Sequence, residues 1–109
     1  MFTLESEIGD EIKCRLFRDF LDVIILRRLA RGRPLGGSDF TTVINYDFGL
    51  MISAETVYAT LYSMERSGLI VSALEGRKKV FLLTDKGKET IKVISSVRDK
   101  IMGWMSNLL

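Results

Sequence analysis

A run of three adjacent cations is the strongest chemical signal in the sequence. The polar segment 75–79 contains Arg77, Lys78 and Lys79 after Gly76, and it lies between two short apolar runs. This pattern predicts a β-hairpin whose turn uses a positive φ at Gly76. Cations at a hairpin tip can contact phosphates or enter a minor groove, and phosphate contacts supply most sequence-independent affinity for DNA. A solvated turn would show the same charges, so this run alone does not decide.

Small polar residues form a second candidate surface, on a helix predicted over about residues 53–67. Ser53 is a good N-cap, and Gly68 is expected to end the helix in a left-handed conformation. The inward stripe is Val57, Leu61 and Met64, broadened by Tyr58 and Tyr62. The candidate contacts to phosphates and base edges in a major groove are Ser53, Glu55, Thr56, Thr60 and Ser63. An ordinary exposed helix face is the alternative.

Catalytic and metal-binding chemistry are poorly supported. The chain has no histidine, which removes the commonest general base and the commonest metal ligand. Its single cysteine, Cys14, lies inside a helical pattern and has no histidine to activate it. We therefore predict no enzyme, no metal site and no cofactor.

The bulk composition predicts one cytoplasmic domain. The chain has 109 residues, a net charge of +2 and 47% hydrophobic residues, which suits a folded domain and leaves nucleic acid open as a partner. One cysteine cannot form an internal disulfide, as is usual in a reducing compartment. The longest apolar run near the N-terminus, 23–26, is far shorter than a membrane span, so no membrane association is expected.

The remaining elements must position these two surfaces. One long amphipathic helix is predicted over about 8–31, and Gly32 and Pro34 stop it. A short helix should follow from 37 or 38 to about 44, and 45–49 reads as a loop that carries two aromatic residues.

A last helix is predicted after Thr84, which can cap it. Its apolar residues recur at intervals of three and four, as in a coiled-coil seam about two heptads long: Ile94, Val97, Ile101, Trp104 and Leu108. A lone helix of this length is marginal in water, so the seam needs a partner surface.

The resulting order is helix, helix, helix, strand, strand, helix. This predicts a mainly α protein with a small β-hairpin, that is, a winged helix-turn-helix with a long N-terminal helix and a C-terminal dimerisation helix. Residues 1–84 would form the winged-helix region with its N-terminal helix, and 85–109 the dimerisation helix.

The sequence resembles the PadR-like family of winged-helix transcriptional regulators from about residue 23 to residue 91. The residues that carry the resemblance are Ile25-Leu26, 29–37, Ser53, 56–62, 64–70 and 76–87. The helix that runs into Met-Glu-Arg-Ser-Gly-Leu-Ile and the wing that ends in Phe-Leu-Leu-Thr-Asp-Lys-Gly are fairly specific together. Either half alone also looks like other winged-helix families, and Gly37-Ser38 stand where an aromatic residue is usual.

The resemblance implies a repressor that binds double-stranded DNA as a homodimer. Tyr58 matches the family tyrosine of the recognition helix, and Arg77 to Lys79 match its basic wing. The implied dimer interface joins the N-terminal and C-terminal helices through Leu16, Phe20, Ile94, Val97, Ile101, Trp104 and Leu108. Any small-molecule effector would lie at this interface.

Two other functions stay open at this point. A winged helix can use the same helix face to bind another protein without binding DNA, and the low net charge and Glu55 favour that alternative. Trp104, with Tyr46 and Phe48, could form an aromatic ligand pocket between protomers. The simpler interpretation is that Trp104 packs in the seam.

Overall fold

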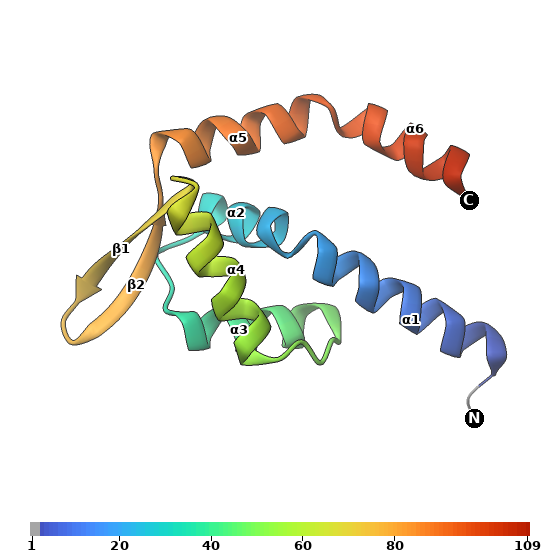
Figure 1. Cartoon of the computed structure of the whole chain (residues 1–109), viewed down its shortest axis with the longest axis horizontal. Helices are drawn as coiled ribbons and strands as arrows, with labels where there is room; N and C mark the ends of the chain where they lie inside the picture. The colour runs from blue at the N-terminus through green and yellow to red at the C-terminus, as the bar shows by residue number, and fades with distance from the viewer. Residues whose placement is uncertain (1–2) are drawn as a thin grey trace.

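The computed structural model describes residues 3–109 and has six helices and one two-stranded antiparallel hairpin in that range (Figure 1). The elements in order are α1 Leu4–Asp19, α2 Leu21–Arg31, α3 Gly37–Phe48, α4 Ala54–Arg66, β1 Ile70–Glu75, β2 Lys78–Leu83, α5 Asp85–Ser96 and α6 Arg98–Leu108. The predicted mainly α fold with a small hairpin is confirmed.

The core lies between α2, α3, α4 and the base of the hairpin. Its most completely buried large side chains are Leu21, Ile25, Leu26, Phe40, Ile44, Val57, Leu61, Ile70 and Phe81. They are all apolar, and no polar or charged residue in 3–109 is buried as a whole. Burial of apolar surface is therefore the main stabilising term of this body. A backbone hydrogen bond of 2.8 Å from the Phe81 N–H to the Leu35 carbonyl ties the hairpin to the segment before α3.

The predicted single helix over 8–31 is wrong, because the chain bends at Phe20 between α1 and α2. Phe20 has φ −103° and ψ 22°, outside helical values, and serves both as C-cap of α1 and as N-cap of α2. Helix α2 buries four residues in the core, whereas α1 buries none and extends beyond the body (Figure 1). The bend thus lets α2 follow the core while α1 leaves it. No proline or glycine marks this position in the sequence.

Helix α3 is longer than predicted, since 45–48 is its last turn and not a loop. Gly49 ends it with a left-handed φ of +63°. The Asn45 side chain explains the ordered turn that follows: its Oδ1 accepts from the Ile52 N–H and its Nδ2 donates to the Ile52 carbonyl, both at 2.8 Å. The Asn45 side chain therefore satisfies both backbone polar groups of the buried Ile52 and fixes the path of the chain from α3 into α4.

Helix α4 and the hairpin agree with the sequence prediction. The Ser53 hydroxyl accepts from the Thr56 N–H at 3.2 Å as an N-cap, and Gly68 follows the helix with φ +79°. Strands β1 and β2 pair from Ile70↔Leu83 to Glu75↔Lys78, so the turn consists of Gly76 and Arg77. Only Gly76 of these two has a positive φ, at +64°, which is typical of a type II′ turn.

The predicted single C-terminal helix is also wrong, because it divides at Val97 into α5 and α6. Val97 has φ −103° and ψ 10°. Helix α5 begins at the Thr84 cap, and its first turn is pressed onto the segment that enters β1: a Cβ at Gly87 would lie 2.1 Å from the Leu69 carbonyl oxygen. Helix α6 continues away from the body (Figure 1).

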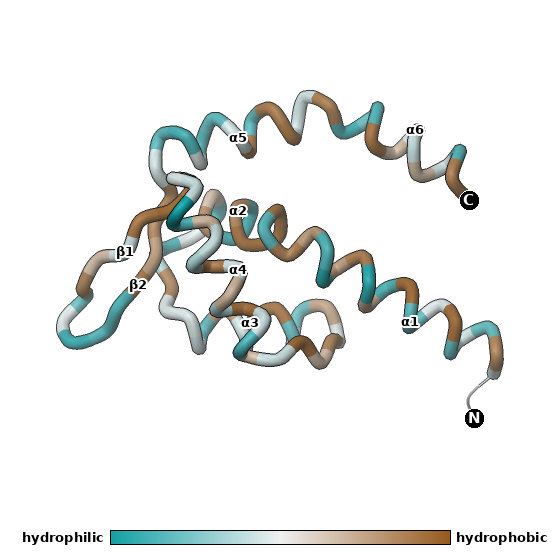
Figure 2. The backbone as a smooth tube through the Cα atoms, in the orientation of Figure 1, coloured by the Kyte–Doolittle hydropathy of each residue, from teal (hydrophilic) through white to brown (hydrophobic). Residues whose placement is uncertain are grey.

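Helices α1 and α6 carry apolar side chains with nothing packed over them. Figure 2 shows hydrophobic segments recurring along both helices outside the body. The exposed apolar residues of these helices, with Phe20 at the bend after α1, are Leu4, Ile8, Ile12, Phe20, Met102, Trp104 and Leu108. An apolar stripe at helical spacing that meets no core within the chain is a surface that favours association.

Candidate nucleic-acid interface

The outer face of α4 is made of small and polar residues. Val57, Leu61 and Met64 are buried, as predicted, and the side chains opposite them are exposed: Glu55, Ala59, Tyr62, Ser63 and Arg66. Small residues at the centre of a helix face allow its backbone to approach another surface closely. An open groove of about 550 Å³ runs along one side of this face, toward the junction of α1 and α2.

Three of the predicted hydroxyl contacts are engaged within α4 itself. Ser53 Oγ lies 2.9 Å from Thr56 Oγ1, and the Thr60 hydroxyl donates to the Thr56 carbonyl at 3.0 Å. Thr56 and Thr60 are half-buried. The Thr60 proton is therefore already used, and only one proton is used between Ser53 and Thr56, so one of these two hydroxyls can still donate. Glu55 and Ser63 are exposed, and no side-chain hydrogen bond or ion pair within 3–109 involves either.

The two tyrosines of α4 have different environments. The Tyr58 ring lies against the start of α3, since a Cβ at Gly37 would come within 2.2 Å of it. Tyr62 was expected to broaden the inward stripe, but 43% of it is exposed. Helical geometry explains this exposure. Successive residues are rotated by 100° about the helix axis, so Tyr62, five residues after Val57, faces well away from the buried stripe.

The wing cations are less free than the sequence suggested. Lys78 forms an ion pair with Asp39 in the first turn of α3, the only ion pair within residues 3–109. The Lys78 ammonium, with a hydrogen bond from the Gly36 N–H, lowers the pKa of the Asp39 carboxyl below its ordinary value. This pair links the tip of β2 to α3 and neutralises one of the three cations. Asp39 is 39 positions away in the chain, and no local pattern connects the two residues.

Lys79 and Arg77 complete the wing. Lys79 Nζ lies 5.3 Å from the ring centroid of Tyr62 and 5.4 Å from that of Phe81, within the range of a cation–π interaction. Arg77 is exposed at the turn, and its side chain makes no hydrogen bond or ion pair within 3–109. The structure therefore holds Lys78 and Lys79 against the body and leaves Arg77 to reach outward.

The predicted interface residues fall into three groups. Leu16, Phe20 and Ile101 line an apolar groove of about 300 Å³ together with Phe17, Ile24 and Met105. Ile94 and Val97 are half-buried beside the bend between α5 and α6. Trp104 and Leu108 are 64% and 76% exposed. Every side chain that lines the groove is apolar.

The proposed aromatic pocket does not form within one chain. Phe48 packs against Phe17 with ring centroids 4.7 Å apart, whereas Tyr46 and Trp104 are exposed. Within residues 3–109 there is no group of three histidine, cysteine or carboxylate side chains placed to hold a metal ion. In the same range, every helix is too short or too polar to cross a membrane.

The fold is that of PadR-family transcriptional regulators. A PadR-family regulator from Eggerthella lenta matches with a TM-score of 0.75 and 22% identity over 95% of this chain and 94% of the other. A PadR-like regulator from Bacillus cereus matches with a TM-score of 0.73 and 23% identity over 86% of this chain and 95% of the other. The predicted winged helix-turn-helix fold is thus confirmed.

A third similar structure contains DNA. PadR of Bacillus subtilis, in complex with operator DNA, has a TM-score of 0.56 and is 28% identical over 66% of this chain and 44% of that one. No protein-family model matches the sequence, and no curated protein matches it either.

Proposed function

We propose that this chain is a PadR-like transcriptional regulator that binds double-stranded DNA sequence-specifically as a homodimer and acts as a repressor. The observation that carries the proposal is the joint geometry of α4 and the wing: a helix with a small polar outer face beside a hairpin whose tip presents a free arginine. In this proposal α4 enters the major groove, and the wing contacts the backbone or the minor groove. The resemblance to a regulator solved with operator DNA supports it.

The charge distribution assigns different tasks to the two surfaces. The outer face of α4 carries one acid, Glu55, and one base, Arg66, so its charges cancel. Ala59 and Ser63 between them are small enough to approach base edges. Arg77 supplies the outward-facing charge on the wing, because Lys78 is neutralised by Asp39. We therefore expect weak non-specific binding, with specificity from α4.

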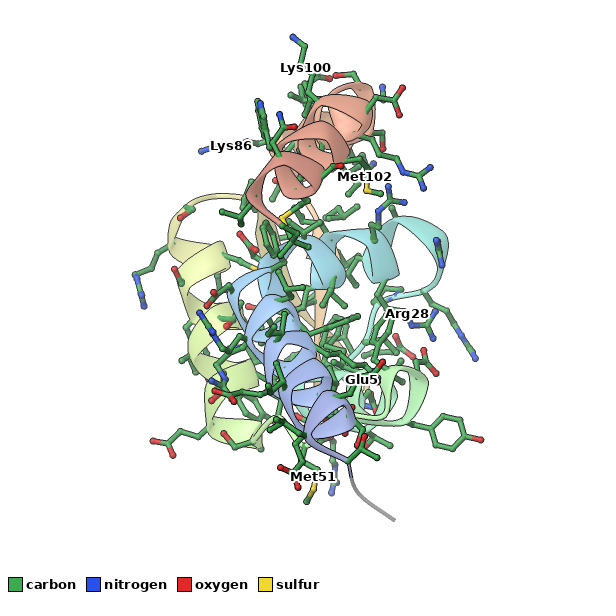
Figure 3. All side chains as sticks on the ribbon, turned by 90° about the vertical axis from the view of Figure 1, so that its right-hand side faces the viewer. Glu5, Arg28, Met51, Lys86, Lys100 and Met102 are labelled. Atoms are coloured by element: carbon green, nitrogen blue, oxygen red, sulfur yellow. The ribbon has the colours of Figure 1, made fainter. Side chains whose placement is uncertain are left out.

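A DNA-binding assay on Arg77→Ala tests the wing. Loss of one phosphate contact per protomer should weaken binding and lower the slope of log K against log salt by about 0.9 per contact, or roughly 2 per dimer. Lys100→Ala is the matched control, since it removes one cation on α6, far from α4 in Figure 3. Unchanged affinity and slope in Arg77→Ala would contradict the proposed role of the wing.

Selection of bound sequences from random DNA tests specificity and symmetry together. A homodimer should select a two-fold symmetric consensus with half-sites about one helical turn apart. An asymmetric consensus would contradict the dimeric mode of binding.

The homodimer is supported by the apolar faces that α1 and α6 leave uncovered. Changing Ile101 and Trp104 together to Asp should give monomers in sedimentation, because two charges would be buried at the seam. As a control, Tyr46→Asp places one such charge on an exposed aromatic position of α3 and should leave the dimer intact. A folded Ile101/Trp104 variant that stays dimeric would show that the seam is misplaced. An apolar effector, if one acts on this dimer, would be expected in the groove beside Ile101.

The second candidate, a protein-interaction module, is favoured by the balanced charge of α4. Absence of any salt-dependent DNA binding by the purified dimer would select this alternative over the regulator.

A further inference from the structure

A cleft of about 480 Å³ on the side of α2 and α3 gathers an unusual number of arginines. Three come from α2 and one from the first position of α6, and a single carboxylate stands among them: Arg27, Arg28, Arg31, Arg98 and Asp47. The rest of the lining is apolar and consists of Ile24, Val43, Ile44 and Phe48. The cleft shares no lining residue with the groove along α4. Figure 3 shows Arg28 between α2 and α3, on the side of the body away from α4.

The arginines of this cleft lack counter-charges within the part of the chain that the structure describes. The only ion pair there joins Lys78 and Asp39, so none of the four guanidiniums is within 4.0 Å of a carboxylate. Four cations and Asp47 leave a net charge of +3 in one cleft. The Nε of Arg28 is buried and has no hydrogen-bond partner. Like charges held together and an unsatisfied buried donor both raise the free energy of the unliganded cleft.

We propose that this cleft binds a small molecule that carries a pyrophosphate group beside an apolar or aromatic part, such as a nucleoside diphosphate. Guanidinium groups bind phosphate oxygens with paired N–H donors, and several of them around one site match a group with two or more negative charges. The apolar lining offers a surface for the uncharged part of the ligand. A monocarboxylate would leave most of the positive charge uncompensated.

The position of Arg98 links this site to the C-terminal arm. Arg98 is the first residue of α6, directly after the bend at Val97, whereas the other arginines belong to the body. A ligand that contacts both Arg98 and α2 fixes the direction in which α6 leaves the body. The proposed dimer uses α6, so occupancy of the cleft alters dimer geometry. This consequence depends on the proposed function, but binding to the cleft does not.

Isothermal titration of the 109-residue chain with sodium pyrophosphate, at constant ionic strength and without DNA, tests the proposal. Arg28→Gln and Arg98→Gln should each weaken binding at least about tenfold, the effect expected for one charge-assisted hydrogen bond. Arg77→Gln is the matched control, because it removes the free cation of the wing and should change the affinity less than about twofold. Circular dichroism verifies that each variant is folded.

Several outcomes would overturn the proposal. These are absence of pyrophosphate binding, equal weakening by Arg77→Gln, and folded Arg28 and Arg98 variants that bind as tightly as the original protein. The proposal would also be overturned if the Arg28 and Arg98 variants became monomeric but still bound pyrophosphate. That result would indicate that these arginines form ion pairs with carboxylates of a second copy of the chain. A second titration compares adenosine diphosphate with pyrophosphate, and tighter binding of the nucleotide would support the role of the apolar lining. Because no DNA is present, failure here is distinct from failure of the DNA-binding proposal.

Discussion

Replacement of Asn45 should destabilise the protein far more than its place near the end of a helix suggests. Its amide makes two 2.8 Å hydrogen bonds to the N–H and carbonyl of Ile52, which is 7% exposed. Asn45→Ala removes both bonds and leaves two buried backbone groups unsatisfied, at about 1–2 kcal/mol each. The higher helix propensity of alanine offsets roughly 0.5 kcal/mol of this. The expected loss in the free energy of unfolding is thus about 1.5–3.5 kcal/mol.

Denaturant unfolding followed by circular dichroism, at one protein concentration, measures this loss. Asn107→Ala is the matched control, because Asn107 is an exposed residue near the end of α6 that makes no side-chain hydrogen bond within 3–109. It should change the free energy of unfolding by less than about 0.5 kcal/mol. We call the two hydrogen bonds between Asn45 and Ile52 the Asn45 clamp. If Asn45→Ala lowers the free energy of unfolding no more than the control does, the clamp does not stabilise the protein.

Asn45→Asp gives a sharper test, because it makes the clamp depend on pH. An ionised carboxylate can accept from the Ile52 N–H but cannot donate to the Ile52 carbonyl, which it repels. The protonated acid can donate, so folding favours protonation and raises the pKa of the new group. The protonated side chain of the Asn45→Asp variant therefore stabilises the fold at a pH below about 3.9, the ordinary pKa of an aspartate. This stabilisation is lost as the pH rises through the raised pKa of the folded state. A deficit relative to the original protein that does not shrink at low pH would contradict this reasoning.

Two further predictions concern the wing and its junction. Gly87→Ala should lower the free energy of unfolding by about 1–3 kcal/mol, because its Cβ would lie 2.1 Å from the Leu69 carbonyl oxygen. Gly103→Ala, where no atom lies within 4 Å of the added Cβ, should leave stability equal or higher; equal losses in both variants would contradict the contact. Lys78→Ala should raise the pKa of Asp39 toward 3.8 in an NMR titration. The pair stabilises the fold above that pH and loses its effect as the pH falls through the lowered pKa; an unmoved Asp39 pKa would show that the pair does not form in solution.

The candidate interface was only partly visible in the sequence. The helical period identified the outer face of α4, and Arg77 was recognised as a wing cation. In the sequence, Lys78 and Lys79 are indistinguishable from Arg77, because charge along a chain does not reveal which partners lie nearby. Asp39 and Tyr62 supply those partners from α3 and α4.

The sequence by itself determined the features that depend on neighbouring residues. Caps at Ser53 and Thr84 act within one helical turn, and the positive φ values of Gly68 and Gly76 follow from the absence of a Cβ. The helix-then-hairpin order and the winged-helix fold follow from these local signals and from the apolar periodicity.

Only the tertiary structure decided where the N-terminal helix bends and which distant groups meet. No helix-breaking residue marks the bend at Phe20, which separates α1, with no buried residue, from α2, with four residues in the core. The bend at Val97 has a local contribution, because the Ser96 hydroxyl donates a hydrogen bond of 2.7 Å to the Val93 carbonyl. The Asn45 clamp depends on packing that positions Ile52. The arginine cleft joins α2 to Arg98, about 70 residues along the chain, so no sequence window contains it. Local signals set the elements, and burial of apolar surface sets which of them come together.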